Sequence, residues 1–381
     1  MSPRADSVGS VPLRIAIAGS RGFPHVYSGY ETFVANVAPR LAARGHEVTV
    51  YCHRGLFTPR PPVVDGVRLV YVPAIERKVL SQLSHSLLTT LHVVAAARPD
   101  VVLYVNSANG PFGWLLRTGG IRSAINVDGL EWLRPKWKGL GARYFRWASG
   151  VATRSFDVVV TDANAMADIY RREFGAASTT IAYGANVGFS ERAERVRECG
   201  VEPGEYFLVV GRLIPDNNGD LLVRGFTRTN IRRKLLVVGD VPYRDAYAAA
   251  VRGTDDPRVL FPGYVRDQDL LRELYCNAYV YLHGHEFGGT NPALLNALAC
   301  GCAVAALDTP FNREVLLDGR HGRLFLKDES AVAHLLTTLD QSPGVVRELG
   351  ATARDRIAER YTWEGITDQY EAMLERLART R

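Results

Sequence analysis

The chain has 381 residues, of which 47% are hydrophobic and 23% charged, so we exclude a disordered or fibrous protein and predict two domains with full cores. Its formal net charge of +6 is modest, so the position of the basic residues along the chain says more about an anionic partner than their number does. The five cysteines form no C-x-x-C pair, which argues against a disulfide framework or a structural zinc site and favours a reducing cytoplasm. Residues 1–12 lack the apolar core of a signal peptide, and no run of 18 apolar residues follows, so we expect a disordered start and no membrane span.

The first half of the chain alternates short apolar runs with amphipathic segments. Short apolar runs bounded by turn residues are typical of buried strands, and the longer amphipathic segments predict helices. The predicted strands are 13–18, 47–52, 67–72, 101–105, 123–127, 158–161 and 180–182, with helices at 30–41 and 79–97. The opening order of strand, glycine-rich loop, helix and strand is typical of doubly wound α/β folds.

The second half repeats this alternation after a charged, strandless segment at about 188–204. We place the domain boundary there, so the prediction is an N-terminal domain over 13–187, a C-terminal domain over 188–360 and a last segment, 361–381, that could pack back on the N-terminal domain. The predicted strands are 206–211, 234–239, 259–261, 278–282 and 303–306, with helices from 292 and over 363–379. Two successive α/β domains predict a cleft between them, which is a common place for a ligand.

A glycine-rich loop follows the first predicted strand. Gly19 and Gly22 come directly after the strand, and Ser28 and Gly29 open the next helix. Glycine lets backbone amides approach an anion, and the helix N-terminus adds a positive dipole. A tight strand-to-helix turn without a ligand explains the loop equally well.

Arg212 is the candidate ligand-binding residue of the second half. It directly follows a predicted strand, at the edge of the sheet where ligands of open α/β folds bind. Its guanidinium suits a diphosphate. The alternative is an ion pair with Asp216.

The stretch 283–292 also follows a predicted strand and opens a helix at its proline. Its free amides predict an anion site, and Glu286 could accept hydrogen bonds from sugar hydroxyls. His283 and His285 lie two residues apart with no third ligand evident, so we do not expect a metal there.

A basic segment at 132–154 contains cations and aromatic residues but no acidic residue. The cations are Arg134, Lys136, Lys138, Arg143, Arg146 and Arg154, and the aromatic residues are Trp132, Trp137, Tyr144, Phe145 and Trp147. A basic, aromatic, amphipathic helix suits an anionic membrane surface or a lipid-diphosphate acceptor. A solvated helix whose tryptophans pack inward is the alternative.

Two further polar residues, His85 and Asp128, are expected to face the cleft. Asp128 ends a predicted strand, so it is the better candidate to orient an acceptor hydroxyl. Capping of the following turn is an equally good explanation of Asp128.

Five stretches form a specific combination: 19–24 (GSRGFP) with 28–33 (SGYETF), 126–132 (NVDGLEW), 210–213 (VGRL) with 215–218 (PDNN), 283–300, and 361–363 (YTW). Together they resemble the family-4 retaining glycosyltransferases of GT-B fold over nearly the whole chain. The chain is most similar to the bacterial branch with a rhamnosyltransferase-type N-terminal domain. This resemblance implies an α/β fold of two Rossmann-like domains that face a central cleft.

The resemblance also implies transfer of a sugar from a nucleoside diphosphate donor with retained anomeric configuration. Expected catalytic residues are Arg212, Glu286 and Asp128. Expected donor-site residues are Gly19, Gly22, Gly29, Arg212, Asn217, Gly288, Gly289, Thr290 and Asn296, and expected acceptor-site residues are Tyr30, Glu31, His85, Asn109, Asp128, Glu131 and Trp132. Preorganised arginine and amide donors stabilise charge on a leaving diphosphate, so we expect no metal and no cofactor besides the nucleotide sugar.

Two positions depart from the family pattern. Asn217 stands where many members carry Lys, although the rhamnosyl-type branch often has Asn. Asn296 stands where the family usually has a Glu that accepts hydrogen bonds from ribose hydroxyls, and an uncharged amide accepts more weakly. A deoxyribose loses less from this change, which favours a dTDP-linked donor.

The expected function is transfer of L-rhamnose or another deoxyhexose to a lipid-linked glycan or a small glycosylated molecule, in the cytoplasm or at the inner face of the plasma membrane, without nucleic acid as a partner. One alternative is a sugar-nucleotide epimerase of the same architecture, which needs carboxylates on both sides of the donor sugar. The other is a catalytically silent sugar-nucleotide or glycan binding protein, which Asn296 favours.

Overall fold

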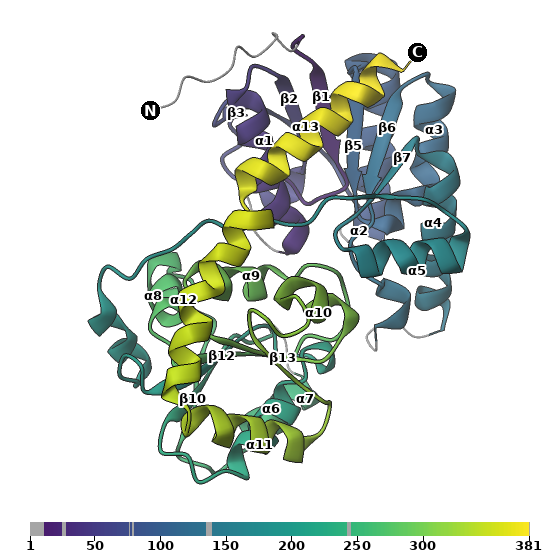
Figure 1. Ribbon diagram of the computed structural model, residues 1–381. Coiled ribbons are helices and arrows are strands. Elements are labelled where there is room, and N and C mark those ends of the chain that lie inside the picture. Colours follow the sequence, from purple (N-terminus) through teal and green to yellow (C-terminus); the bar gives the residue numbers. More distant parts are fainter. Residues whose placement is uncertain are drawn as a thin grey trace.

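The computed structural model describes residues 11–24, 28–75, 77, 80–134, 139–241 and 245–380. These residues form two α/β domains, each built on its own largely parallel sheet (Figure 1). The predicted fold class is therefore confirmed, whereas most of the N-terminal segment that we expect to be disordered lies outside the described residues.

The N-terminal domain contains an eight-stranded sheet in the order β3-β4-β2-β1-β5-β6-β7-β8, parallel except for the β3–β4 pair. Its strands are β1 (Arg14–Ala18), β2 (Glu47–His53), β3 (Val63–Val64), β4 (Val67–Val72), β5 (Val101–Val105), β6 (Arg122–Asn126), β7 (Val158–Thr161) and β8 (Thr179–Thr180). Its helices are α1 (Gly29–Ala43), α2 (Leu80–His92), α3 (Gly113–Thr118), α4 (Leu140–Ser155) and α5 (Asn164–Phe174). The helix predicted over 79–97 ends earlier, because α2 passes into a π-helical turn, η2 (Val93–Ala97).

Helix α1 shows how the sequence builds this core. Its apolar residues Phe33, Val34, Val37 and Leu41 recur on one face and are fully buried against the sheet. Burial of side chains of this size contributes roughly 1.5–3 kcal/mol each. The helix is therefore held with its N-terminus, Gly29, at the carboxyl edge of the sheet, next to the cleft.

The C-terminal domain contains a six-stranded parallel sheet in the order β11-β10-β9-β12-β13-β14. Its strands are β9 (Tyr206–Val210), β10 (Lys234–Val238), β11 (Val259–Gly263), β12 (Val280–His283), β13 (Val304–Leu307) and β14 (Arg323–Phe325). The helices of this half are α6 (Gly219–Thr227), α7 (Ala246–Arg252), α8 (Gln268–Cys276), α9 (Pro292–Ala299), α10 (Pro310–Leu316), α11 (Glu329–Asp340), α12 (Pro343–Arg360) and α13 (Trp363–Arg379). Among the described helices, none combines the length and apolar composition that crossing a bilayer requires.

The chain passes between the domains twice, and the two crossings lie side by side. The Ala185 N–H donates to the carbonyl of Tyr361 (2.7 Å), and Ala185 pairs with Thr362. After the second crossing, α13 lies across the N-terminal domain (Figure 1). There Asn126 Nδ2 donates to the hydroxyl of Tyr370 (2.8 Å), so the last helix joins the core of the first domain.

Candidate active site in the interdomain cleft

The two domains enclose a cavity of about 660 Å³. An adjoining cavity of about 330 Å³ extends along the C-terminal domain, and both are lined by Arg212, His285, Asn291, Pro292, Ser28 and Gly29. The predicted residues that line one or both are Gly19, Gly29, Tyr30, Glu31, Asp128, Glu131, Arg212, Asn217, Gly288, Gly289 and Thr290. Most of them follow the carboxyl ends of parallel strands or open the next helix, which is why they meet at one place.

Arg212 lies at the centre of this arrangement. It follows β9, is exposed, and lines both cavities. Among the ion pairs of the described residues none involves Arg212, and the alternative pairing with Asp216 is not formed. Asp216 Oδ2 instead lies 4.0 Å from Nε of Arg134, which reaches across from the N-terminal domain. Arg212 therefore presents an uncompensated positive charge to the cleft.

Asn217 and His285 form a hydrogen-bonded chain beside Arg212. Asn217 Nδ2 donates to the carbonyl of Arg212 (2.8 Å), so its Oδ1 is left as the acceptor for Nδ1 of His285 (2.7 Å). His285 Nδ1 must then carry the hydrogen, because an amide oxygen cannot donate. Burial lowers the pKa of His285 well below its usual value, so the ring is neutral and Nε2 carries a lone pair.

His285 is a cleft residue that the sequence-based prediction left out of the site. The prediction considered it only as a poor metal ligand, whereas it lines both cavities. Its position directly after β12 could have identified it, because Arg212 was selected by the same criterion.

Glu286, by contrast, faces away from the cavities. Its Oε2 accepts hydrogen bonds from Lys327 Nζ (2.5 Å) and from Asn218 Nδ2 (3.3 Å), and it lines neither cavity. In this conformation the carboxylate of Glu286 is held by Lys327, and its expected contact with a donor sugar stays a prediction.

The glycine-rich loop of the N-terminal domain is tied together by Glu31. Its Oε1 accepts from the amide of Arg21 (2.8 Å) and its Oε2 from the hydroxyl of Ser28 (2.5 Å), so one buried carboxylate joins the two halves of the loop. Gly19 has a φ of +92°, and a Cβ there would lie 2.3 Å from the carbonyl of Val105. This position requires glycine because the loop passes close to β5. Gly22 packs against Cys52 and lines neither cavity.

Asp128 is partly buried in the wall of the cleft that the N-terminal domain forms. Its Oδ2 accepts from the hydroxyl of Tyr183 (2.8 Å), and its carbonyl accepts from Tyr30. Burial raises the pKa of Asp128 despite the Tyr183 hydrogen bond and the nearby Arg134 charge. Within the described residues no amide of the next turn donates to its carboxylate, and Leu130 holds the N-cap position, so the capping explanation is not supported.

Besides Gly22 and Glu286, four predicted residues line neither cavity. His85 is fully buried and stacks on His53 with ring centroids 3.7 Å apart, so it does not face the cleft. Asn109 is buried beneath Gly19, where its Nδ2 donates to the carbonyl of Val105 (2.8 Å). Trp132 packs edge-on against Tyr170 and Phe174 in the core. Asn296 is exposed on α9, one helical turn beyond the cavity residues Pro292 and Ala293.

Some described residues of the basic segment at 132–154 line the cleft, and others are exposed on the surface. Arg134 lies in the cleft, where its Nε contacts Glu131 (3.2 Å), so it is not part of an outer surface. Lys136, Trp137 and Lys138 lie outside the described residues. Tyr144 and Phe145 of α4 line the cavity. Leu133, Leu140 and Trp147 are exposed, together with Arg143, Arg146 and Arg154.

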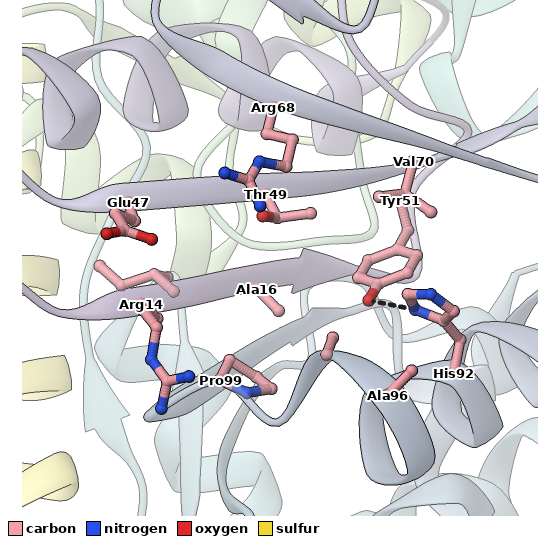
Figure 2. A pocket seen from close by; sticks show the side chains of 12 residues that line it. Arg14, Ala16, Glu47, Thr49, Tyr51, Arg68, Val70, His92, Ala96 and Pro99 are labelled. Carbon is pink, nitrogen blue, oxygen red and sulfur yellow. Dashed lines mark hydrogen bonds between the residues drawn. The ribbon is translucent and has the colours of Figure 1, made fainter.

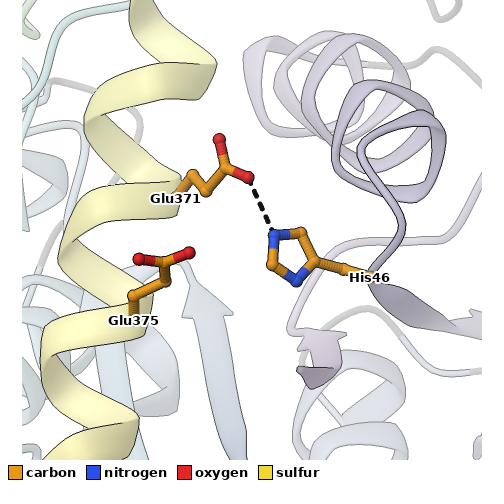
Figure 3. Close-up of side chains that lie close together, drawn as sticks. All are labelled: His46, Glu371 and Glu375. Atoms are coloured by element: carbon orange, nitrogen blue, oxygen red, sulfur yellow. Dashed lines mark hydrogen bonds and ion pairs between the residues drawn. The ribbon is translucent and has the colours of Figure 1, made fainter. Parts of the chain in front are cut away.

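Within the described residues, one group of side chains has the spacing of metal ligands, and it lies far from the cleft residues in the fold. It consists of His46, Glu371 and Glu375, where α13 meets the N-terminal domain (Figure 3). His46 Nδ1 accepts from the amide of Leu13 (3.1 Å), so Nε2 carries the hydrogen and donates to Glu371 (2.9 Å). Neither ring nitrogen keeps a free lone pair, so this cluster is a hydrogen-bonded attachment of α13.

A third cavity, of about 210 Å³, lies on the open face of β1, β2 and β4 (Figure 2). The residues on this face alternate along each strand, as in Glu47, Thr49 and Tyr51 of β2. Tyr51 is hydrogen-bonded to His92 Nδ1 (2.9 Å), and Arg14 is paired with Asp100 (2.9 Å). None of the predicted site residues lies there, so the interdomain cleft remains the candidate active site.

Comparison with known proteins finds two matching domain families: residues 28–186 match the glycosyl transferase 4-like domain, and residues 204–341 match the glycosyl transferases group 1. The chain is 25% identical to alpha-maltose-1-phosphate synthase of Mycolicibacterium smegmatis, over 94% of this chain and 97% of that protein. It is also 25% identical to phosphatidyl-myo-inositol mannosyltransferase of Mycobacterium tuberculosis, over 93% and 94%. The crystal structure of Anabaena HepE in complex with UDP-glucose is similar with a TM-score of 0.76 at 14% identity, covering 96% of this chain and 100% of that one.

Proposed function

Because the chain belongs to the GT-B glycosyltransferases, which use nucleotide-sugar donors, we propose that it transfers L-rhamnose or a related deoxyhexose from a dTDP-linked donor. The acceptor is a glycan, a lipid-linked precursor or a small glycosylated molecule, and the anomeric configuration is retained. The observation that carries the proposal is the unpaired Arg212 between the two domains, next to the turn at Gly288 and Gly289. A cation that lines a cleft without a protein counter-ion favours an anionic ligand, and a diphosphate has the charge and the pairs of oxygens that a planar guanidinium binds.

In the proposed reaction the bond between the anomeric carbon and the diphosphate oxygen breaks, and the acceptor oxygen bonds to that carbon. Arg212 stabilises the negative charge that develops on the diphosphate, so a metal is not required for this step. The neutral His285 accepts a hydrogen bond from a donor hydroxyl at Nε2. The acceptor hydroxyl is oriented by Asp128, and its proton passes to that carboxylate or to the leaving phosphate.

The preference for thymidine nucleotides is supported by Asn296. It lies on the face of α9 that continues from Pro292 and Ala293 in the smaller cavity, and it is uncharged. Without a carboxylate at this position, a ribose loses the charge-assisted hydrogen bonds of two hydroxyls, whereas a deoxyribose loses that of one, so the binding of a ribonucleotide is weakened more.

The proposed acceptor is presented at an anionic membrane at the inner face of the plasma membrane. The first turn of α4 contributes Leu140 and Gly141 to the cavity wall, and Leu140 is also 80% exposed. Trp147 is 56% exposed on the same helix, and Arg143, one helical turn before it, is also exposed. A lipid-linked acceptor can therefore keep its polar head in the cavity while its chain remains beside this basic and apolar surface.

The activity is tested with purified protein, dTDP-L-rhamnose and UDP-glucose, by measuring released nucleotide with and without lipid-linked or small glycoside acceptors. Acceptor-dependent release of dTDP supports the proposal. Epimerised nucleotide sugar without an acceptor identifies an epimerase instead. Nucleotide binding without either product identifies a silent binding protein.

The membrane contact is tested by sedimentation with vesicles of phosphatidylglycerol and phosphatidylcholine. The variant Arg143→Ser/Trp147→Ser should bind such vesicles several-fold less well, since each basic residue near the surface contributes about 1 kcal/mol. Its matched control is Arg320→Ser/Leu317→Ser, an exposed basic and apolar pair on the C-terminal domain. Equal binding by both variants and the wild type contradicts this part of the proposal.

A further inference from the structure

Asp162 is a residue of the N-terminal domain whose buried carboxyl group contacts the turn at residues 288–290 of the C-terminal domain. We call this turn, where the donor is expected to bind, the donor turn. It directly follows β7 and is fully buried. Its Oδ2 accepts from the amide of Thr290 (2.7 Å), and its carbonyl accepts from the hydroxyl of Thr290 (2.6 Å). The Thr290 amide, for which the family resemblance implies phosphate binding, is therefore already bonded to a carboxyl group of the other domain.

The contact between Asp162 and the donor turn also explains why residue 289 is a glycine. A Cβ at Gly289 would lie 1.7 Å from Oδ1 of Asp162, a distance that no side chain can tolerate. The second glycine of the turn is thus required by the approach of Asp162, so the turn and this carboxyl group fit each other as a unit.

The second oxygen of Asp162 points to a shared proton. Oδ1 is buried and has no hydrogen-bond donor among the described residues. Asp128 and Asp162 follow the neighbouring parallel strands β6 and β7, which pair Asn126 with Val160, so their carboxyl groups lie at adjacent strand ends and interact electrostatically. Burial, followed by the charge of Asp128, raises the pKa of Asp162 well above its usual value. Asp162 is fully buried, and a buried carboxyl group beside a second carboxyl group favours its protonated form, so one proton between the two satisfies the otherwise unpaired oxygen.

The other ionisable groups that interact with this pair do not replace that proton. They are Tyr30, Glu131, Arg134, Tyr170, Tyr183 and Tyr370. Tyr183 already donates to Oδ2 of Asp128, and the nearest cation, Arg134, contacts Glu131. Asp128 and Asp162 both belong to the N-terminal domain, at the ends of the neighbouring strands β6 and β7.

We propose that Asp162 is a positioning residue: through a proton shared with Asp128 and its bonds to Thr290, it holds the donor turn in register with the acceptor side of the cleft. This inference rests on the proposed function, because it assigns the two sides to donor and acceptor. It adds a contact by which closure of the domains aligns both substrates, in place of a direct contact with either.

A second interdomain contact of the same chemical kind provides the control. Glu314 of α10 accepts from the amides of Asn164 (3.0 Å) and Ala165 (3.1 Å) at the start of α5. It too joins the domains through a carboxylate and backbone amides, but it touches neither the donor turn nor Asp128. Its removal weakens domain docking without releasing Thr290.

The first experiment compares Asp162→Ala, Asp162→Asn and Glu314→Ala by calorimetric Kd for dTDP and by kcat and KM for donor turnover. Asp162→Ala should weaken nucleotide binding or kcat about tenfold, because it leaves the buried Thr290 amide unpaired. Asp162→Asn keeps an acceptor for Thr290 and an N–H for Asp128, so it should stay within about threefold of the wild type. Glu314→Ala should also keep Kd and kcat within about threefold of the wild-type values, because it leaves Thr290 bonded to Asp162. Equal losses in Asp162→Ala and Glu314→Ala, or in Asp162→Ala and Asp162→Asn, would overturn the positioning role.

The second experiment measures melting temperatures of the wild type and Asp162→Asn between pH 4 and pH 8, without substrate. The folded-state pKa of Asp162 lies above the unfolded value of 3.8, so its proton stabilises the fold fully below that pH and progressively less as pH rises. Asn does not titrate, so the melting temperature of the variant should rise relative to the wild type with increasing pH. A difference that is constant with pH would refute the shared proton. This result stands even if the protein turns out to use another donor, so failure of the proposed function and failure of the inference are distinguishable.

Discussion

The substitution Arg212→Ala should lower kcat without changing the stability of the folded protein. The side chain is exposed, and it takes part in no ion pair of the described residues, so Arg212→Ala leaves no buried partner unsatisfied. We therefore expect the free energy of unfolding to change by less than about 0.5 kcal/mol. Loss of one preorganised donor to a developing anion costs about 2–4 kcal/mol of activation free energy, which corresponds to a decrease in kcat of roughly 30- to 900-fold.

The assay is initial-rate nucleotide release at saturating donor, with a thermal melt of each variant. Arg212→Lys keeps the charge but loses the planar pair of donors, so its kcat should lie between those of Arg212→Ala and the wild type. Arg320→Ala removes an exposed arginine far from the cleft residues and should change neither quantity. A kcat for Arg212→Ala above half the wild-type value, or a large fall in melting temperature that accompanies the loss of activity, would refute the role of Arg212.

Three further predictions concern other parts of the molecule. Asn296→Glu should improve the calorimetric Kd for UDP more than that for dTDP, by on the order of 1 kcal/mol, and equal gains would contradict a ribose-binding role. His285→Ala should lower kcat more than Glu286→Gln, because only His285 lines the cleft, and steady-state kinetics giving the reverse order would show that Glu286 leaves Lys327 during turnover. Burial alone would raise the pKa of Glu371, but hydrogen bonds from His46 and Arg44 lower it overall. Its stabilising effect is therefore complete above the unfolded value of 4.5 and lost as pH falls, so Glu371→Gln should lower the melting temperature more at pH 7 than at pH 3.5.

The strands and their order along the chain follow from local patterns. Short apolar runs identified β1, β4, β5 and β7 with their bounds nearly unchanged, and the last helix was predicted over the residues that α13 occupies. The two-residue strand β3 was missed, because two residues carry no periodicity. The helix predicted over 79–97 was too long, since the sequence pattern does not distinguish the end of α2 from the π-helical turn that follows it.

The sequence by itself determined where the chemistry lies. In a parallel sheet all strand ends lie at one edge, so Arg212, Asp128 and the glycine loop could be assigned to the same cleft without coordinates. Only the tertiary structure decided which way adjacent side chains turn. His285 and Glu286 are neighbours in one loop, but the first is held by Asn217 toward the cleft and the second by Lys327 away from it.

The same limit explains Asp162. It follows a strand as Asp128 does, so its position was visible in the sequence, but its partner Thr290 lies 128 residues further along the chain. Burial, unpaired oxygens and shared protons arise only when distant segments pack together, because they depend on which groups exclude water from one another. Local patterns specify strands, helices and their edges, whereas the charge state and orientation of the side chains in the cleft are set by partners that are distant in the sequence.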